Sequence, residues 1–432
     1  MNLTLLAIIG IVIMLILILS GANIGLCMII TGILGYAVVR DWNGALTMVK
    51  TYLVSNSMSY SMTVIPLFVL MGQFAFYSGI SDDLFNSTRI WFGKKSGGMA
   101  YAGVVSCGLF GAICGSLAAT TATMSKVAYP IMKKHNYKDE IIGGTMASAG
   151  VLGPLIPPST PFILYGLTTS VSIGKLFAAG ILPGIVQALC FCIVIAIWCR
   201  RDKELCPAGE SYPIKEKLKA LKGFLGMAVL FALVLGGMFS GLCSVTEAAA
   251  LGCTIAFIIL LVRRRFTWSS FKTAVLETIS TTGMVMINVV GAGIFGCFLT
   301  VTGLPQALAN WVLANDFPGW LVILVILVVF AVFGCIMDTL ALMLLAVPIF
   351  LPLLQALGFD LIWFGALIVM IMNLGAVTPP VGLSCYVAAG VMNMPLNKVF
   401  KGAAPFLLGI AGAILVVAFI PALSTWLPSF MS

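Results

Sequence analysis

Long apolar runs separated by short polar loops dominate the chain. Three of the clearest are NLTLLAIIGIVIMLILILSG (2–21), FLGMAVLFALVLGGMF (224–239) and LVILVILVVFAVFG (321–334). Each is roughly long enough to cross a hydrocarbon core of ~30 Å as a helix, whereas the strands of a membrane β-barrel alternate in short segments. The pattern predicts an all-α polytopic membrane protein with about ten to twelve hydrophobic elements, beginning with two N-terminal helices.

The first apolar run is expected to be a transmembrane helix. No Lys or Arg precedes Arg40, and a cleaved signal peptide would carry a basic region before its apolar stretch.

Three interruptions break the apolar pattern where a membrane protein tolerates them least. GPLIPPSTP (153–161) and GAVTPPVG (375–382) each carry a Pro-Pro pair, which removes backbone donors and clashes with the preceding helical turn. The apolar block 97–130 is interrupted at its middle by GAICGSLAATTAT (111–123). Irregular backbone at membrane depth occurs where it is buried in protein or lines a cavity. We therefore expect two broken helices, and a re-entrant hairpin over 97–130.

The same order of landmarks occurs twice, which predicts an internal repeat. An amphipathic stretch, a hairpin, a Pro-Pro break and a lysine-bearing helix follow one another from about 77 to 184 and again up to about 406. The second copy supplies a second hairpin around FGCIMDT (333–339). Corresponding residues keep a nearly constant offset: Gly111 and Gly334, Gly153 and Gly375, Pro157 and Pro379, Lys175 and Lys398.

The basic loops orient the two copies. Lys and Arg concentrate near residues 94, 133, 200 and 263, as the positive-inside rule predicts for cytoplasmic loops. One crossing from about 274 to 300 then separates the copies, so they have opposite topology. Inverted repeats with broken helices are typical of secondary transporters. We expect scaffold helices (1–63), repeat 1 (64–185), scaffold helices and loops (186–287), repeat 2 (288–407) and a C-terminal helix (408–432).

Composition agrees with this class. The 432 residues are 61% hydrophobic and 9% charged, with a mean hydropathy of +1.14, so a soluble fold could not cover its surface. The net charge of +9 lies in short loops and does not indicate nucleic-acid binding. The twelve cysteines have no CxxC spacing, and His135 is the only histidine. No GxxxxGK[ST], HExxH or GxSxG motif is present. We expect no enzyme, and energy from an ion gradient or another subunit.

The hairpin tips and the breaks are the candidate sites. Carbonyls freed by proline can be satisfied by a hard cation with oxygen ligands, and the alternative is a kink satisfied by neighbouring Ser and Thr hydroxyls. The predicted sodium ligands form two sets: Ser116, Thr120, Gly153 and Pro154 in the first, and Asp338, Thr339, Gly375 and Thr378 in the second. The substrate's acidic group is expected beside Ser116, Ser159, Thr160 and Asp338.

Three charged residues within or next to apolar segments have competing interpretations. Asp338 is a functional candidate because burying a charge at membrane depth costs at least ~2.5 kcal/mol; the alternative is an interfacial carboxylate or a hairpin cap beside Thr339. Ser244 and Glu247 fit a structural capping box. Lys126 can snorkel to the cytoplasmic interface, and the alternative is that it attracts an anionic substrate.

Longer motifs resemble one known family. GSLAATTATMSKVAYPIMKKHNY (115–137), ASAGVLGPLIPPSTPFILYG (147–166), SIGKLFAAGILPG (172–184), TEAAALG (246–252) and LGAVTPPVG (374–382) are similar to the large membrane subunit of tripartite ATP-independent periplasmic (TRAP) transporters. The resemblance implies a sodium-driven elevator-type architecture in the bacterial inner membrane, with two or more sodium ions. It also implies a small four-helix membrane subunit, expected as a separate chain, and a periplasmic substrate-binding protein.

The resemblance further implies an organic-acid substrate. The tip sequence GSLAATTATMSKVAYP (115–130) looks like the sialic-acid branch, whereas dicarboxylate relatives have a tip closer to GSSVAT. N-acetylneuraminate is therefore the expected substrate, and a C4-dicarboxylate or another sugar or keto acid is the alternative. An ion channel and a membrane-embedded enzyme are the rivals from other classes.

Overall fold

The computed structural model describes residues 3–202, 206–207 and 212–431, and in these ranges the chain is helical without strands. The elements of the N-terminal half are α1 (Leu3–Leu19), α2 (Ile24–Val39), α3 (Trp42–Ser57), η1 (Tyr60–Thr63), α4 (Val64–Tyr77), α5 (Ile80–Phe92), α6 (Gly98–Cys114), α7 (Leu117–Lys134), α8 (Asp139–Gly150), α9 (Thr160–Thr169) and α10 (Ile173–Arg201). Those of the C-terminal half are α11 (Ile214–Ala220), η2 (Leu221–Phe224), α12 (Leu225–Phe239), α13 (Val245–Val262), α14 (Trp268–Thr302), α15 (Leu304–Ala314), α16 (Gly319–Gly334), α17 (Thr339–Ala356), α18 (Leu361–Val377), α19 (Leu383–Met392), α20 (Leu396–Phe419), α21 (Ala422–Thr425) and η3 (Pro428–Phe430).

Several of these helices suit a membrane. Within the described ranges, seven are long and apolar enough to cross one: Tyr60–Tyr77, Ile173–Arg201, Ile214–Phe239, Val245–Val262, Trp268–Thr302, Thr339–Ala356 and Leu396–Phe419. Several apolar helices of the hairpins and breaks are shorter, as expected for segments that end inside a protein: Gly98–Cys114, Gly319–Gly334, Leu361–Val377 and Leu383–Met392. The fold is therefore that of a multi-pass helical membrane protein.

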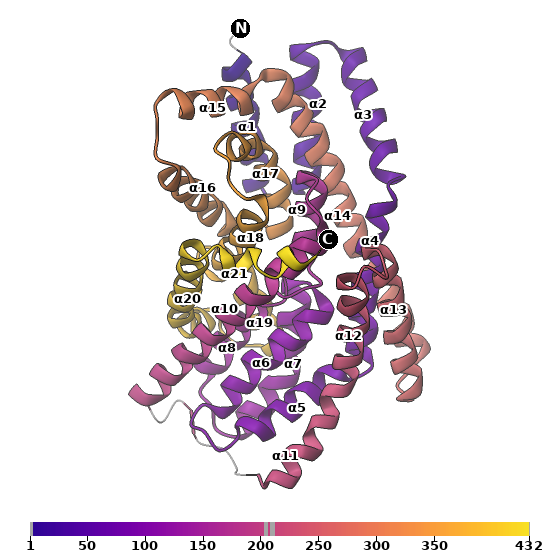
Figure 1. Ribbon diagram of the computed structural model, residues 1–432, viewed down its shortest axis with the longest axis vertical. Coiled ribbons are helices and arrows are strands. Elements are labelled where there is room, and N and C mark those ends of the chain that lie inside the picture. The colour runs from indigo at the N-terminus through magenta and orange to yellow at the C-terminus, as the bar shows by residue number, and fades with distance from the viewer. Residues whose placement is uncertain (1–2, 203–205, 208–211, 432) are drawn as a thin grey trace.

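The helices pack as two neighbouring groups. The long α14 packs on α2 and α4, and α4 packs on α13. In the other group, α8 packs on α7 and α20, and α18 packs on α16 and α20. The two groups meet where α14 contacts α17 and α4 contacts α6. Figure 1 shows α14 running along the molecule beside α2 and α3, with α6, α7 and α8 in the lower part.

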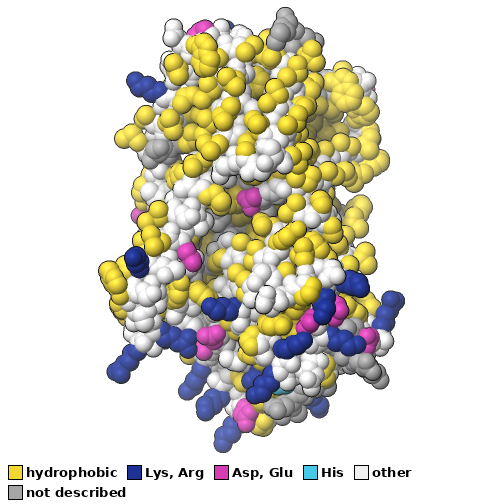
Figure 2. All heavy atoms as spheres, turned by 180° about the vertical axis from the view of Figure 1, so that it is seen from behind, with side chains coloured by type: hydrophobic (Ala, Val, Ile, Leu, Met, Phe, Trp, Pro, Cys, Tyr) yellow, Lys and Arg dark blue, Asp and Glu magenta, His cyan; other side chains and the backbone are white. Residues whose placement is uncertain are grey.

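Basic side chains gather at one end of the molecule. Lys and Arg crowd the lower end of the face in Figure 2, the level at which α5, α8 and α11 lie in Figure 1. Arg263 pairs with Asp83 there, and Lys133 and Lys398 both pair with Asp139. The hydrogen bond from Lys133, and then that from Lys398, lower the pKa of Asp139 although partial burial opposes them. This is the end that the positive-inside rule predicts to face the cytoplasm.

Both predicted kinds of interruption are present. Residues 115–116 separate α6 from α7, and residues 335–338 separate α16 from α17, so each pair forms a helical hairpin. Residues 151–159 break α8 from α9, and residues 378–382 break α18 from α19. Both Pro-Pro bonds, Pro157–Pro158 and Pro379–Pro380, are cis.

One element differs from expectation, and the expected segment boundaries do not coincide with helix ends. Three helices, not two, precede Val64, because Trp42–Ser57 forms α3 although polar side chains such as Asn43 and Lys50 interrupt its apolar pattern. The expected boundaries after 185, 287 and 407 fall inside the continuous helices α10, α14 and α20. Each of these helices therefore contributes to two of the expected segments, and the division itself stays a prediction.

The capping box at the start of α13 is confirmed. Ser244 Oγ accepts from the Glu247 amide at 3.3 Å, and the Glu247 carboxylate accepts from the Ser244 amide at 2.8 Å. The carboxylate is thus occupied at an exposed helix start, which supports the structural interpretation of Glu247.

Loss of this cap has a small, local expected effect. Ser244→Ala removes one acceptor from the first turn of α13, so the midpoint of thermal unfolding in detergent should fall by about 2 °C. Transport per folded molecule should stay at the wild-type level. A loss of transport at unchanged thermal stability would contradict the structural role.

Candidate functional site

The first hairpin tip is a two-residue turn between α6 and α7. Gly115 adopts φ 61°, a left-handed conformation that favours glycine, and its amide closes α6 by donating to Gly111 O at 2.8 Å. Ser116 is extended, and its carbonyl accepts from Thr120 N at 3.0 Å to begin α7. The tip therefore presents the start of α7, with its positive helix end, to the protein interior.

The first break lies against this tip. Ser159 caps α9 by accepting from Phe162 N at 3.5 Å, and its hydroxyl donates to Pro154 O. The Thr160 amide donates to Gly115 O at 3.3 Å, which joins the break to the tip. The hydroxyl of Ser159 is fully buried and used locally. One freed carbonyl is thus satisfied by a neighbouring serine, as the alternative interpretation of the prolines expects.

A small oxygen-lined cradle remains at Gly153. A methyl group there would lie 2.5 Å from Thr120 Oγ1 and 3.0 Å from Ser116 O, so two oxygens approach this backbone position closely. The Thr120 hydroxyl is fully buried and has no hydrogen-bond partner among the described residues. Buried hydroxyls are ordinarily satisfied. An oxygen donor set with an orphaned hydroxyl fits a hard cation such as sodium.

The second tip carries the carboxylate. Asp338 is the N-cap of α17, and its carboxylate accepts from Leu340 N at 3.1 Å. The Val381 amide from the second break donates to Cys335 O at 3.3 Å, which repeats the tip-to-break bond of the first half. The Thr378 hydroxyl donates to Leu374 O at 2.7 Å within its own helix. Asp338 therefore has the cap role that the alternative interpretation predicted, at the tip of the second hairpin.

Close glycine contacts hold each hairpin on its own break. A methyl group at Gly111 would meet Gly153 Cα at 2.6 Å, and one at Gly375 would meet the carbonyl carbon of Gly334 at 2.4 Å. These are the same four glycines that correspond between the two copies in the sequence. Backbone thus packs on backbone in both halves, where side chains would keep the elements apart.

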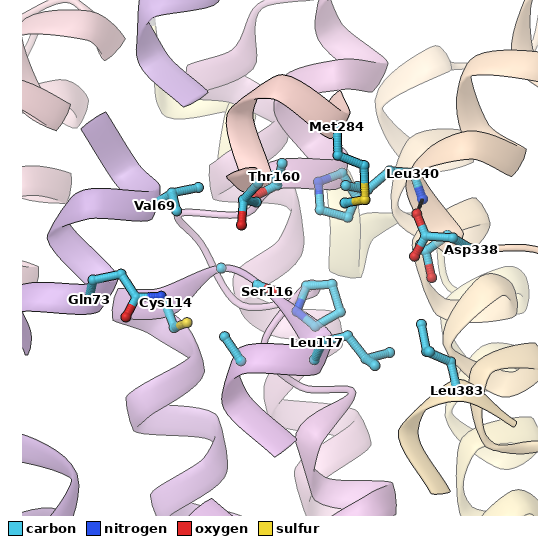
Figure 3. Close-up of a pocket in the computed structure, with 17 residues that line it drawn as sticks. Val69, Gln73, Cys114, Ser116, Leu117, Thr160, Met284, Asp338, Leu340 and Leu383 are labelled. Carbon is cyan, nitrogen blue, oxygen red and sulfur yellow. Dashed lines mark hydrogen bonds between the residues drawn. The ribbon is translucent and has the colours of Figure 1, made fainter. Parts of the chain in front are cut away.

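The two tips line one cavity of about 130 Å³. Five of the predicted site residues line it: Ser116, Pro154, Thr160, Asp338 and Thr339. The others lie outside its lining: Thr120, Gly153, Ser159, Gly375 and Thr378. Figure 3 shows Asp338 at one side of the cavity, Ser116 and Thr160 near its middle, and Gln73 at the opposite side. The arrangement places hydroxyls and one carboxylate around a common space.

Residues of α4 and α14 complete the cavity and were not predicted. Gln73 of α4 and Thr281 and Met284 of α14 line it together with the tips. Gln73 is the only amide side chain within VIPLFVLMGQFAFY, and a lone polar group inside an apolar span is a signal that sequence reasoning could have used. Thr281 and Met284 carry no such signal, since Ser, Thr and Met recur along α14.

Comparison with known proteins decides the family. The sequence pattern described as "Tripartite ATP-independent periplasmic transporter, DctM component" matches residues 11–423. The chain belongs to this family. It is a large membrane subunit of a TRAP transporter, as the resemblance of its motifs predicts, and all tip and break residues lie within the matched range.

Individual relatives agree with the TRAP assignment. The chain is 35% identical over 380 residues to the C4-dicarboxylate TRAP transporter large permease protein DctM of Pseudomonas aeruginosa, covering 88% of each protein. It is 29% identical over 371 residues to the sialic acid TRAP transporter large permease protein SiaM of Vibrio cholerae, covering 86% of each. The YdaH transporter of Alcanivorax borkumensis has a similar fold, with a TM-score of 0.65 at 16% identity over 87% of this chain and 88% of that one.

The unpaired Thr120 hydroxyl allows a test of whether the cradle at Gly153 binds sodium in this TRAP subunit. Thr120→Val keeps the shape of the side chain and removes its oxygen, so the sodium concentration that gives half-maximal uptake should rise about tenfold or more. Thermal stability should stay the same or increase, because an unsatisfied buried hydroxyl is lost. An unchanged sodium dependence would exclude Thr120 as a ligand. Thr168→Val, whose hydroxyl donates to Leu164 O on α9, is the matched control.

Proposed function

We propose that this subunit carries an organic anion across the bacterial inner membrane together with sodium. The single observation that supports this most is the shared cavity, because Ser116 of one tip and Asp338 of the other line the same space. Hydroxyls and the positive starts of α7 and α9 suit an acidic group. Asp338 repels that group unless a cation lies between them. Sodium and substrate are therefore expected to bind together.

Two sodium positions follow from the donor sets. The first is the Gly153 cradle, where Thr120 Oγ1 and Ser116 O both lie close to Gly153. Pro154 O, which already accepts from the Ser159 hydroxyl, would be a further donor through its second lone pair. The second lies beside Asp338 and Thr339, with backbone carbonyls of the 375–378 segment as further donors. At each position part of the oxygens would come from backbone next to a Pro-Pro pair, where proline removes amide donors.

The mechanism proposed is an elevator built from inverted repeats. The matched glycine contacts and the matched tip-to-break bonds, Thr160 N to Gly115 O and Val381 N to Cys335 O, support two equivalent halves. They would keep the hairpins and broken helices together as one body. The cavity lies where this body meets α4 and α14, so a slide of the body along these helices would move the substrate between the two sides of the membrane.

Membership of the TRAP family supports the proposed partners and an organic acid as the class of substrate. N-acetylneuraminate is the first candidate, on the sequence of the first tip. A C4-dicarboxylate is the second, favoured by the 35% identity to a permease of that name and by a cavity of about 130 Å³, below the ~300 Å³ at which drug-sized ligand pockets begin. A small four-helix membrane subunit and a periplasmic binding protein complete the transporter.

Reconstitution tests this function. The subunit is placed in proteoliposomes with its small partner, and binding protein, labelled substrate and an inward sodium gradient are applied outside. Saturable uptake of N-acetylneuraminate or succinate that stops when potassium replaces sodium is expected. Uptake that is equal in potassium would overturn the sodium coupling. A steady ionic current from the large subunit alone would instead indicate a channel.

A further inference from the structure

A second cavity, of about 200 Å³, continues the central one toward the basic end of the molecule. Gln73, Cys114 and Ala119 line both cavities. The cavity on the other side, of about 520 Å³ between α3, α9, α14 and α17, shares no lining residue with the central one. The central cavity is therefore connected toward the basic, cytoplasmic end.

Three helices line this connection with residues spaced three or four apart. On α14 the series is Glu277, Thr281 and Met284; on α7 it is Ala119, Thr123 and Lys126; on α4 it is Val69, Gln73 and Phe76. Such spacing places each series on one helix face. The faces of α4, α7 and α14 thus enclose one continuous path that leads from the tips to Lys126 and Glu277.

Charged side chains line the cavity on one side of the central cavity but not the cavity on its other side. Lys126 and Glu277 are exposed and line the second cavity, and neither belongs to a salt bridge in the described part of the chain. The described lining of the cavity toward the opposite end contains polar side chains such as Thr168, Thr300 and Gln355, but no charged one. A lysine that only snorkelled would point to the interface, whereas this ammonium lies at the mouth of a cavity joined to the site.

We propose that the second cavity is a release vestibule for the transported anion. Lys126 attracts the acidic group of the substrate as it leaves the tips, and Glu277 across the same space weakens that attraction so that the anion departs. The proposal rests on the anion transport proposed above and extends it to named residues. Opposite charges on the two walls would keep binding in the vestibule weak, since each partly cancels the other's field.

The two charges should act in opposite directions on one measurable quantity. In proteoliposomes, binding protein is supplied outside only, so only correctly oriented molecules exchange labelled external for unlabelled internal substrate. The probe is whichever of N-acetylneuraminate and succinate the wild type exchanges. Lys126→Gln should raise the KM for internal substrate by about three- to tenfold, and Glu277→Gln should lower it by a similar factor. Lys126→Arg should restore the wild-type value.

Controls separate this role from a structural one. The KM for external, protein-delivered substrate should not change, and the internal effect of Lys126→Gln should shrink at high ionic strength. A structural role would predict losses in both variants and no salt dependence. If both variants keep the wild-type internal KM while the wild type exchanges substrate, the vestibule is wrong and the proposed function stands. If the wild type exchanges no organic anion, the proposed function fails and the vestibule fails with it.

Discussion

Replacement of Asp338 by alanine is expected to abolish sodium-driven uptake, to below about 1% of wild type. Among the described residues that line the central cavity, Asp338 is the only acid. A cation held between the tips would lose its one formal counter-charge, and a substrate anion would lose the cation that makes its binding favourable. Because the proposed mechanism requires both to bind together, the loss should be nearly complete rather than graded.

The cap role of Asp338 must be separated from its charge. Its carboxylate accepts from Leu340 N, so Asp338→Ala also removes an N-cap, at a cost of about 0.5–2 kcal/mol. Asp338→Asn keeps an equally good cap and removes the charge. Thermal stability close to wild type with no uptake is therefore the expected outcome for Asp338→Asn. Uptake above about half of the wild-type rate would contradict the ion-binding role.

A second capped helix supplies the matched control. Asp360 caps α18 by accepting from Ile362 N and Trp363 N, and it lies outside the central cavity. Asp360→Asn should leave both stability and uptake near wild type. A loss of uptake in this variant similar to that of Asp338→Asn would show that helix capping, not charge at the tip, limits transport.

The sequence predicts the local interruptions of this fold well. Paired prolines cannot continue a helix, so the breaks around Pro157 and Pro379 follow from residue chemistry alone. The same holds for the Gly115 turn and for the capping box at Ser244. By contrast, the sequence does not predict α3, because polar residues such as Asn43 and Lys50 interrupt its apolar run.

The composition of the site was less predictable, because it depends on packing between distant helices. Thr120 and Thr378 look alike in the sequence, yet Thr378 donates to its own helix while Thr120 has no partner. Ser159 is similar in type to Ser116, but its hydroxyl is consumed by Pro154 O. Which hydroxyl remains free is decided by the exact direction of the backbone at each break, and periodicity does not encode that direction.

Replacement of Gly375, which packs on Gly334 of the second hairpin, is the other single change expected to reduce uptake strongly. In Gly375→Ala the added methyl would lie 2.4, 2.7 and 2.8 Å from the carbonyl carbon, Cα and carbonyl oxygen of Gly334. All three are backbone atoms, which cannot rotate away as a side chain can. The hairpin and the break must separate, and we expect about 1–3 kcal/mol of destabilisation from overpacking.

The separation also misplaces Asp338 and Thr339, which follow Gly334 in the same hairpin. A displacement of about 1 Å at a binding site can lower a rate by about 100-fold, so uptake by Gly375→Ala should fall by about that factor in protein that still folds. Sodium-dependent uptake, normalised to protein that elutes as a single species, is the measurement. The half-maximal sodium concentration should rise in parallel.

A glycine in the neighbouring helix distinguishes a contact effect from a general effect of alanine. A methyl group at Gly390 of α19 meets no atom within 4 Å, so Gly390→Ala should be neutral or slightly stabilising through its higher helix propensity. Equal uptake by the two variants would show that the hairpin does not need backbone contact with its break. Loss in Gly375→Ala alone would mean that the proposed second sodium position depends on the buried contact with Gly334, because Gly390 is exposed and its added methyl meets no neighbour.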